Sequence, residues 1–149
     1  MGETLTIIFA SITFLFSGYK YLTTRRAEAY SSFDDTYSKL LEFAFQYPKF
    51  RDKKLTSEFR KHFHGDDLIK YQTYAFMCWN FCETIYDIKS DLLNLSQKSI
   101  FNTWVVVIAA ENDLHRSWFD EIENEKKFKR EFRDYIQKKM FPPENIFVT

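Results

Sequence analysis

After residue 27, apolar residues recur at intervals of three and four along most of the chain, with charged residues largely between them. This spacing puts the apolar side chains on one face of an α-helix, so it predicts a series of amphipathic helices. Pro48, Gly65 and the pair Pro142-Pro143 mark the ends of three of them. The expected helices cover residues 30–47, 57–63, 66–88, 96–110 and 112–140.

One of these segments contains three consecutive β-branched residues, Val105 to Val107, which could also form a buried strand. A helix is the favoured interpretation, because the chain offers no second strand for pairing. The expected fold class is therefore all-α, with about five helices around one core. The core residues expected from the apolar stripes are Phe33, Leu40, Tyr74, Cys78, Phe81, Ile85, Trp104, Ile108, Trp118 and Phe132.

The beginning of the chain has a different pattern, because residues 4–19 carry no charge and are mostly apolar on every side. With Lys20 snorkelling to the headgroups, a helix over residues 5–24 would cross the ~30 Å hydrocarbon core of a bilayer. A cleaved signal peptide would need a basic leader and a small-residue cleavage site, and the sequence has neither. A buried core helix is the other alternative. We therefore predict one transmembrane helix.

Basic residues follow this helix and none precedes it, which is the charge bias of an anchor whose C-terminal side is cytoplasmic. Lys20, Arg25 and Arg26 supply the bias. We expect a single-pass protein of the bacterial inner membrane, with an anchor and basic flank over residues 1–26 and a helical cytoplasmic domain over residues 27–149. Membrane lipid around residues 5–24 is thus the first predicted partner.

Composition narrows the class of protein further. With 17 Phe, 9 Tyr and 3 Trp, the chain has too many aromatic residues for a disordered protein. Only 3 Gly and 3 Pro leave too few turn formers for a sandwich or barrel of many strands. The formal net charge is zero, which gives no general attraction to nucleic acid. There is no glycine-rich phosphate loop, and the sequence predicts no cofactor.

The only two cysteines, Cys78 and Cys82, are four residues apart in a strongly helical segment. We interpret them as small buried residues on one apolar face in a reducing compartment. A metal site or a redox pair is the alternative, but no second Cys or His pair completes a zinc set.

Two imidazoles and a carboxylate, from His62, His64 and Asp66, stand close together in the sequence and are the metal-ligand candidates. They would support a metal-dependent hydrolase, but the spacing favours the structural alternative, helix ends whose dipoles interact favourably with these residues. Glu111 and His115 are one helical turn apart, as acid–base chemistry would require, yet the chain lacks the Glu-x-x-His pairs of a di-iron bundle. Glu83 is interpreted as a structural carboxylate that bonds a neighbouring helix.

Charge is unevenly distributed near the C-terminus. Residues 111–125 hold six acids and one Arg, and residues 126–139 hold seven bases and two acids, giving net charges of −5 and +5. One long helix would be stabilised by this order and by the pairs Glu123/Lys127 and Glu125/Lys129. The alternative is a phosphate-binding site. Its candidate residues are Lys126, Lys127, Lys129, Arg130 and Arg133.

Three segments carry a resemblance to other proteins: YPKF, YAFMCWNFCETIYD and FNTWVVVIAAENDLHRSWFDE, after the N-terminal anchor. In this order they resemble bacterial single-anchor helical membrane proteins of uncharacterised function, some of which carry the label of phage abortive-infection proteins. The shared positions, such as Glu83, Trp104 and the pair Trp118-Phe119, are packing residues. The layout is also generally similar to that of membrane-anchored defence effectors that sense cyclic oligonucleotides.

These observations favour a membrane-tethered helical interaction or sensor module, more in keeping with a binding protein than an enzyme, in a bacterial stress or anti-phage system. The expected partner is a second copy of the chain or another protein, since the aromatic content exceeds what the core requires. The first alternative is a receptor for a phosphate-bearing ligand: a nucleotide signal, a nucleic acid or an anionic lipid. The second is the metal-dependent hydrolase.

Overall fold

The computed structural model describes residues 20, 24, 27–28, 30–89 and 95–139, and among them it has helices and no β-strand. The prediction of an all-α fold is thus confirmed, including the helical state of Val105 to Val107. After a helix over residues 30–46, the order is η1 (Pro48–Arg51), α2 (Lys53–Thr56), α3 (Phe59–His62), α4 (Gly65–Lys89), α5 (Leu95–Phe119), η2 (Ile122–Lys127) and α6 (Arg130–Lys139).

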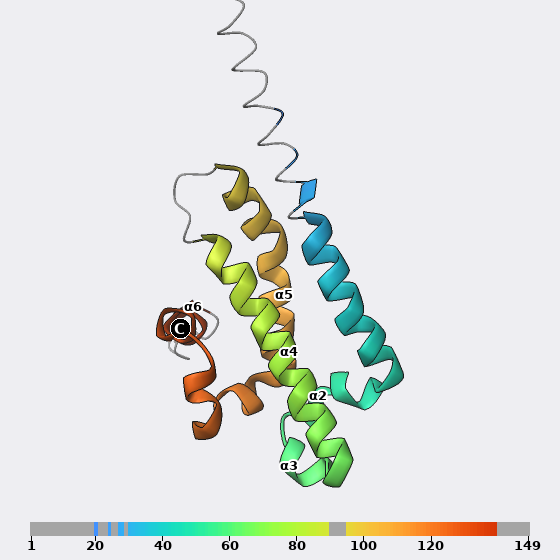
Figure 1. Ribbon diagram of the computed structural model, residues 1–149. Helices are drawn as coiled ribbons and strands as arrows, with labels where there is room; N and C mark the ends of the chain where they lie inside the picture. Colours follow the sequence, from blue (N-terminus) through green and yellow to red (C-terminus); the bar gives the residue numbers. More distant parts are fainter. Residues whose placement is uncertain (1–19, 21–23, 25–26, 29, 90–94, 140–149) are drawn as a thin grey trace, which may run out of the picture.

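Two long helices, α4 and α5, run antiparallel and side by side, and the helix over residues 30–46 packs along them (Figure 1). The short elements η1, α2 and α3 connect the bottom of this helix to the start of α4. Helix α6 is seen nearly end-on in Figure 1, so it runs across α4. Each of the three long helices contacts the other two, so they form a three-helix bundle with the shorter helix α6 on one side.

The helix boundaries follow local chemistry. Tyr47, before Pro48, leaves helical geometry with φ −128° and ψ 67°, as the proline predicts. Asp52 caps α2 by accepting the backbone N–H of Lys54 at 2.9 Å. Gly65 has a φ of +54°, a conformation that glycine adopts at little cost, and it turns the chain into α4. Asp66 and Asp67 lie in the first turn of α4, as expected.

Aromatic side chains form most of the core. All ten residues predicted for the core are buried. Trp79 of α4 stacks on Phe119 of α5 with ring centroids 4.0 Å apart. Phe81 lies against Phe33 at 5.7 Å and against Trp104 at 5.8 Å, joining all three long helices. The high aromatic content is therefore largely used inside the domain.

Three predicted helices are wrong in their extent. The segment 57–63 contains only the short helix α3, because Ser57 is the residue that ends α2 and helix geometry resumes at Phe59. The helix expected over residues 96–110 is part of α5, which continues to Phe119. The expected single helix over residues 112–140 is broken into the end of α5, η2 and α6. The amide of Asn124, which is buried, donates to the carbonyl of Trp118 at 2.6 Å and so helps to end α5.

The charge pairs expected on that single helix do not form among the described residues. Glu123 pairs with Arg60 of α3, and Lys129 pairs with Asp87 of α4. Because η2 and the extended residue Phe128 replace the regular helix, the spacing of four residues no longer brings Glu123 to Lys127 or Glu125 to Lys129.

The predicted anchor, residues 5–24, lies outside the described residues except for Lys20 and Thr24. No helix in the described part of the chain is both long enough and apolar enough to cross a membrane. The anchor and the boundary at residue 26 therefore stay predictions.

Candidate functional site

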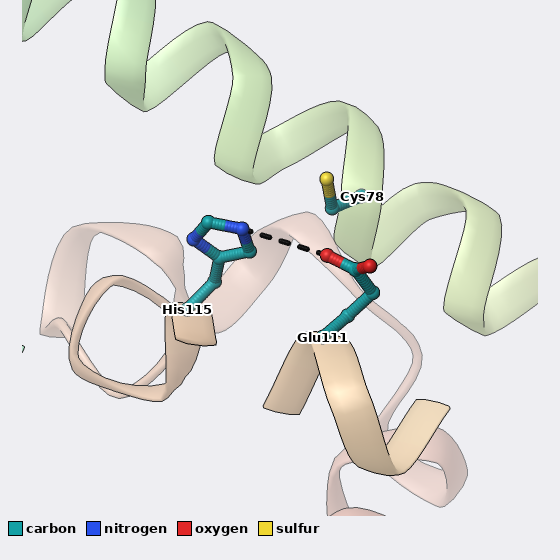
Figure 2. A group of neighbouring side chains, drawn as sticks. All are labelled: Cys78, Glu111 and His115. Carbon is teal, nitrogen blue, oxygen red and sulfur yellow. Dashed lines mark ion pairs between the residues drawn. The ribbon is translucent and has the colours of Figure 1, made fainter. Parts of the chain in front are cut away.

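A cluster of polar side chains lies between α4 and α5 in the centre of the domain. Cys78 comes from α4, and Glu111 and His115 come from successive turns of α5 (Figure 2). All three residues have 0% exposed area. We call them the buried polar cluster. Helical geometry brings Glu111 and His115 onto one face of α5, and antiparallel packing brings Cys78 to the same place.

Glu111 is held by two elements that precede α4. Its Oε1 accepts hydrogen bonds from the Arg51 guanidinium at 2.8 Å and from the Tyr37 hydroxyl at 3.2 Å. Arg51 also donates to the Tyr74 hydroxyl at 3.2 Å. Burial opposes the charge of Arg51, but the Glu111 carboxylate and the Tyr74 hydroxyl together outweigh it, so the pKa of Arg51 is raised. Burial, with the Glu111 charge, raises the pKa of Tyr37 to about 12. Glu111 thus connects η1 and the first described helix to α5.

His115 stands where α5 leaves regular geometry, with φ −119° and ψ 15°. Its Nδ1 is 3.2 Å from the Tyr71 hydroxyl, and its carbonyl accepts the indole N–H of Trp79 at 3.1 Å. Burial lowers the pKa of His115 to about 3, and the Arg51 charge acts in the same direction. The imidazole is therefore neutral at pH 7, so its 3.5 Å approach to Glu111, dashed in Figure 2, carries no full ionic attraction at that pH.

Two atoms of the cluster have no hydrogen-bond partner among the described residues: Oε2 of Glu111 and Nε2 of His115. A buried polar atom without a partner costs roughly 1–3 kcal/mol. One potential ligand atom from each of Glu111, His115 and Cys78 lies within 4.8 Å of the other two. Burial, with Glu111 nearby, raises the pKa of the Cys78 thiol well above its ordinary value, so the sulfur is protonated in the metal-free protein.

This cluster is the only group of three or more potential metal ligands within the described residues. Its side chains can bind a proton or a metal ion. Because none of the three is exposed, a substrate in solvent cannot reach them unless the helices separate. The geometry therefore favours binding within the fold over turnover of a substrate.

A second feature is a surface groove of about 520 Å³ between the helix over residues 30–46 and α4. Phe76 and Met77, which are 38% and 44% exposed, lie on its α4 side. We call it the apolar groove. Its other apolar lining residues are Phe33, Leu40, Phe81 and Ile88, and its polar lining residues are Ser32, Thr36, Lys39, Asn80 and Thr84.

Of the five basic residues predicted for phosphate binding, some contact other parts of the domain and others line a surface hollow. Lys127 bonds Asn124 at 2.6 Å, and Lys129 pairs with Asp87 at 2.6 Å. Arg133 donates to the Phe119 carbonyl at 3.1 Å and lies 4.3 Å from that ring. Lys126 and Arg130, together with Arg133, line a hollow of about 540 Å³. Three of the five side chains thus contact their own domain, and a phosphate ligand stays a prediction.

The predicted metal candidates His62, His64 and Asp66 are exposed, and the structure does not gather their ligand atoms into one group. His62 ends α3 and Asp66 belongs to the first turn of α4. Glu83 accepts the backbone N–H of Lys129 at 2.7 Å, so the structural interpretation of this carboxylate is confirmed. Cys82 is buried but lies outside the buried polar cluster.

The link between Cys78 and the pair Glu111/His115 was missed in the sequence. The only available signal was the spacing of Glu111 and His115, together with Cys78 on an apolar stripe. No protein-family model matches the chain, and comparisons with curated proteins and with solved structures found no match.

Proposed function

We propose that this chain is a membrane-tethered helical interaction module that associates with a second copy of itself through the apolar groove. The observation that supports this most directly is the exposure of Phe76 and Met77 side by side in the groove, on a helix whose other large apolar residues, except Ile69, are buried or half-buried. Phe and Met are enriched at protein interfaces, where their burial removes apolar area from water.

The predicted anchor favours a second copy of the chain as the partner. Chains tethered by residues 5–24 in one membrane are concentrated in a plane and share one orientation. The helix over residues 30–46, which borders the groove, begins only a few residues after that segment. A two-fold axis perpendicular to the membrane would then bring two grooves face to face, as an isologous dimer requires.

The full burial of the only group of three or more potential metal ligands in the described residues also favours a binding role over an enzymatic one. The resemblance described above adds the setting that we propose: a bacterial stress or anti-phage system at the inner membrane.

The test is the native mass of the full chain, extracted from membranes in detergent and measured by light scattering. We expect a dimer, and Met77→Asp should weaken it at least about tenfold, because a carboxylate would be buried without a partner. Val106→Asp is the matched control: Val106 is 65% exposed and does not line the groove. A monomeric wild-type chain would contradict the association, and recovery of the chain without detergent would contradict the tether.

A further inference from the structure

The buried polar cluster has the composition of a transition-metal site. A thiol, a carboxylate and an imidazole are the three side-chain types that bind zinc in proteins. Their potential ligand atoms lie within 4.8 Å of one another. Tetrahedral coordination, with bonds of ~2.0–2.3 Å, requires separations of ~3.5 Å, so side-chain rotations that close the group by about 1 Å would suffice.

The unpartnered atoms provide an independent indication. Nε2 of His115 and Oε2 of Glu111 are fully buried, have no hydrogen-bond partner in the described residues, and face each other at 3.5 Å. Figure 2 shows the Cys78 side chain on the α4 side of the same space. Buried polar groups are nearly always paired, so two buried atoms beside a thiol with only a weak 3.5 Å contact between them are suited to share one ligand.

We propose that Cys78, Glu111 and His115 bind one divalent transition-metal ion of the zinc class between α4 and α5. The thiol selects against magnesium and calcium, which prefer oxygen ligands only. Three protein ligands leave one position of a tetrahedral ion for a further ligand. This site is independent of the apolar groove and of the proposed dimer.

The residues around the cluster already hold the ligands as a metal site requires. Tyr71 contacts Nδ1 of His115 and thereby orients Nε2 toward the site. Arg51 and Tyr37 occupy only Oε1 of Glu111 and leave Oε2 available. Such outer contacts commonly fix the orientation of metal ligands. Their loss typically weakens metal binding by about 10- to 100-fold.

Charge and proton balance are consistent with a divalent ion. Binding would release one proton from the Cys78 thiol, and the ion, the thiolate and the Glu111 carboxylate then sum to zero charge. Arg51, whose side chain is 25% exposed, keeps its own charge in contact with solvent. Nε2 of His115 coordinates the ion when Nδ1 carries the imidazole proton, which the Tyr71 hydroxyl oxygen can accept at 3.2 Å.

Because the cluster is fully buried, metal would be acquired as the helices assemble and would exchange slowly afterwards. The experiment therefore uses the full chain in detergent in two forms. One is purified without chelators and analysed for metals by mass spectrometry. The other is unfolded, stripped of metal and refolded with Co²⁺, whose thiolate complexes absorb by sulfur-to-metal charge transfer.

We expect about one ion per chain and a charge-transfer band after refolding with Co²⁺. Cys78→Ser should abolish the band and lower metal affinity at least about tenfold. Cys82→Ser is the matched control, because Cys82 is equally buried one turn further along α4 but lies outside the group, and it should keep both. Tyr71→Phe should weaken affinity about tenfold and keep the band.

A wild-type chain that folds, as judged by circular dichroism, and shows neither bound metal nor the band would overturn the proposal. Equal losses in Cys78→Ser and Cys82→Ser would also overturn it, since they would reflect disturbed packing. If Cys78→Ser does not fold, His115→Gln replaces it: a folded His115→Gln chain that binds metal as tightly as the wild type contradicts ligation by His115.

Discussion

Two arginine–carboxylate contacts join the early part of the domain to the region of α5, and they differ mainly in burial. Arg51 of η1 reaches Glu111, with side-chain exposures of 25% and 0%. Arg60 of α3 reaches Glu121 and Glu123, with exposures of 49%, 19% and 65%. The residues of each contact are about 60 positions apart along the chain. Their chemistry is the same, and their surroundings are not.

The difference shows that the environment determines the energetic consequence of an ion pair. Solvent screens the Arg60 contacts, and exposed pairs typically contribute ~0–1 kcal/mol. Glu111 has no access to water, so removing its partner would leave a charge in the interior, which typically costs ~3–5 kcal/mol. Removing one partner of a buried salt bridge is thus strongly destabilising, whether or not the intact pair adds net stability.

The largest effect should come from Arg51→Met, which keeps an unbranched side chain and removes the charge. We expect the free energy of unfolding to fall by ~3–5 kcal/mol, because Glu111 loses its ionic partner inside the protein. Urea denaturation followed by circular dichroism, with chelator present, measures it. The double variant Arg51→Met/Glu111→Leu should recover most of the loss. A single-variant loss below ~1 kcal/mol would show that Glu111 is better solvated than its burial indicates.

An intermediate effect should appear in the pH dependence of the metal-free protein. The pKa of His115 is about 3 in the folded state against an ordinary value of 6.5, so the unfolded chain binds the extra proton between these values. Stability should therefore fall as pH decreases below about 6.5, by up to ~1.4 kcal/mol per pH unit. The slope from this residue should be half its maximum at pH 6.5 and should vanish more than about one pH unit above it.

The measurement is urea denaturation between pH 7 and pH 5, where most carboxylates titrate little. His115→Gln should reduce the slope in this window. If the wild type and the variant show equal slopes, His115 does not titrate with a lowered pKa, and another group is responsible for any acid sensitivity.

The smallest effect should come from Arg60→Met, which makes the same chemical change as Arg51→Met at the surface. We expect a loss below ~1 kcal/mol, decreasing further as salt is added, because solvent already screens these contacts. Parallel denaturation of both variants gives the comparison directly. Losses of equal size would show that the Arg60 network is coupled to the core.

Local sequence signals were enough for much of the fold. The apolar periodicity correctly predicted helices, the ten core residues and the helical state of the valine triplet. Pro48 marked the end of the first predicted helix correctly, because proline geometry acts on the residue before it. Such features depend on residues that are close together in the sequence, so they can be predicted from the sequence alone.

Only the tertiary structure decided the features that depend on distant residues. Arg60 of α3 pairs with Glu123, and Lys129 contacts Asp87 of α4, so the expected last helix is divided although its local pattern is helical. Likewise, Cys78 meets Glu111 and His115 only because α4 and α5 pack antiparallel in one particular register. Periodicity identifies which face of a helix is buried, but the residues opposite that face are chosen by packing across the whole core.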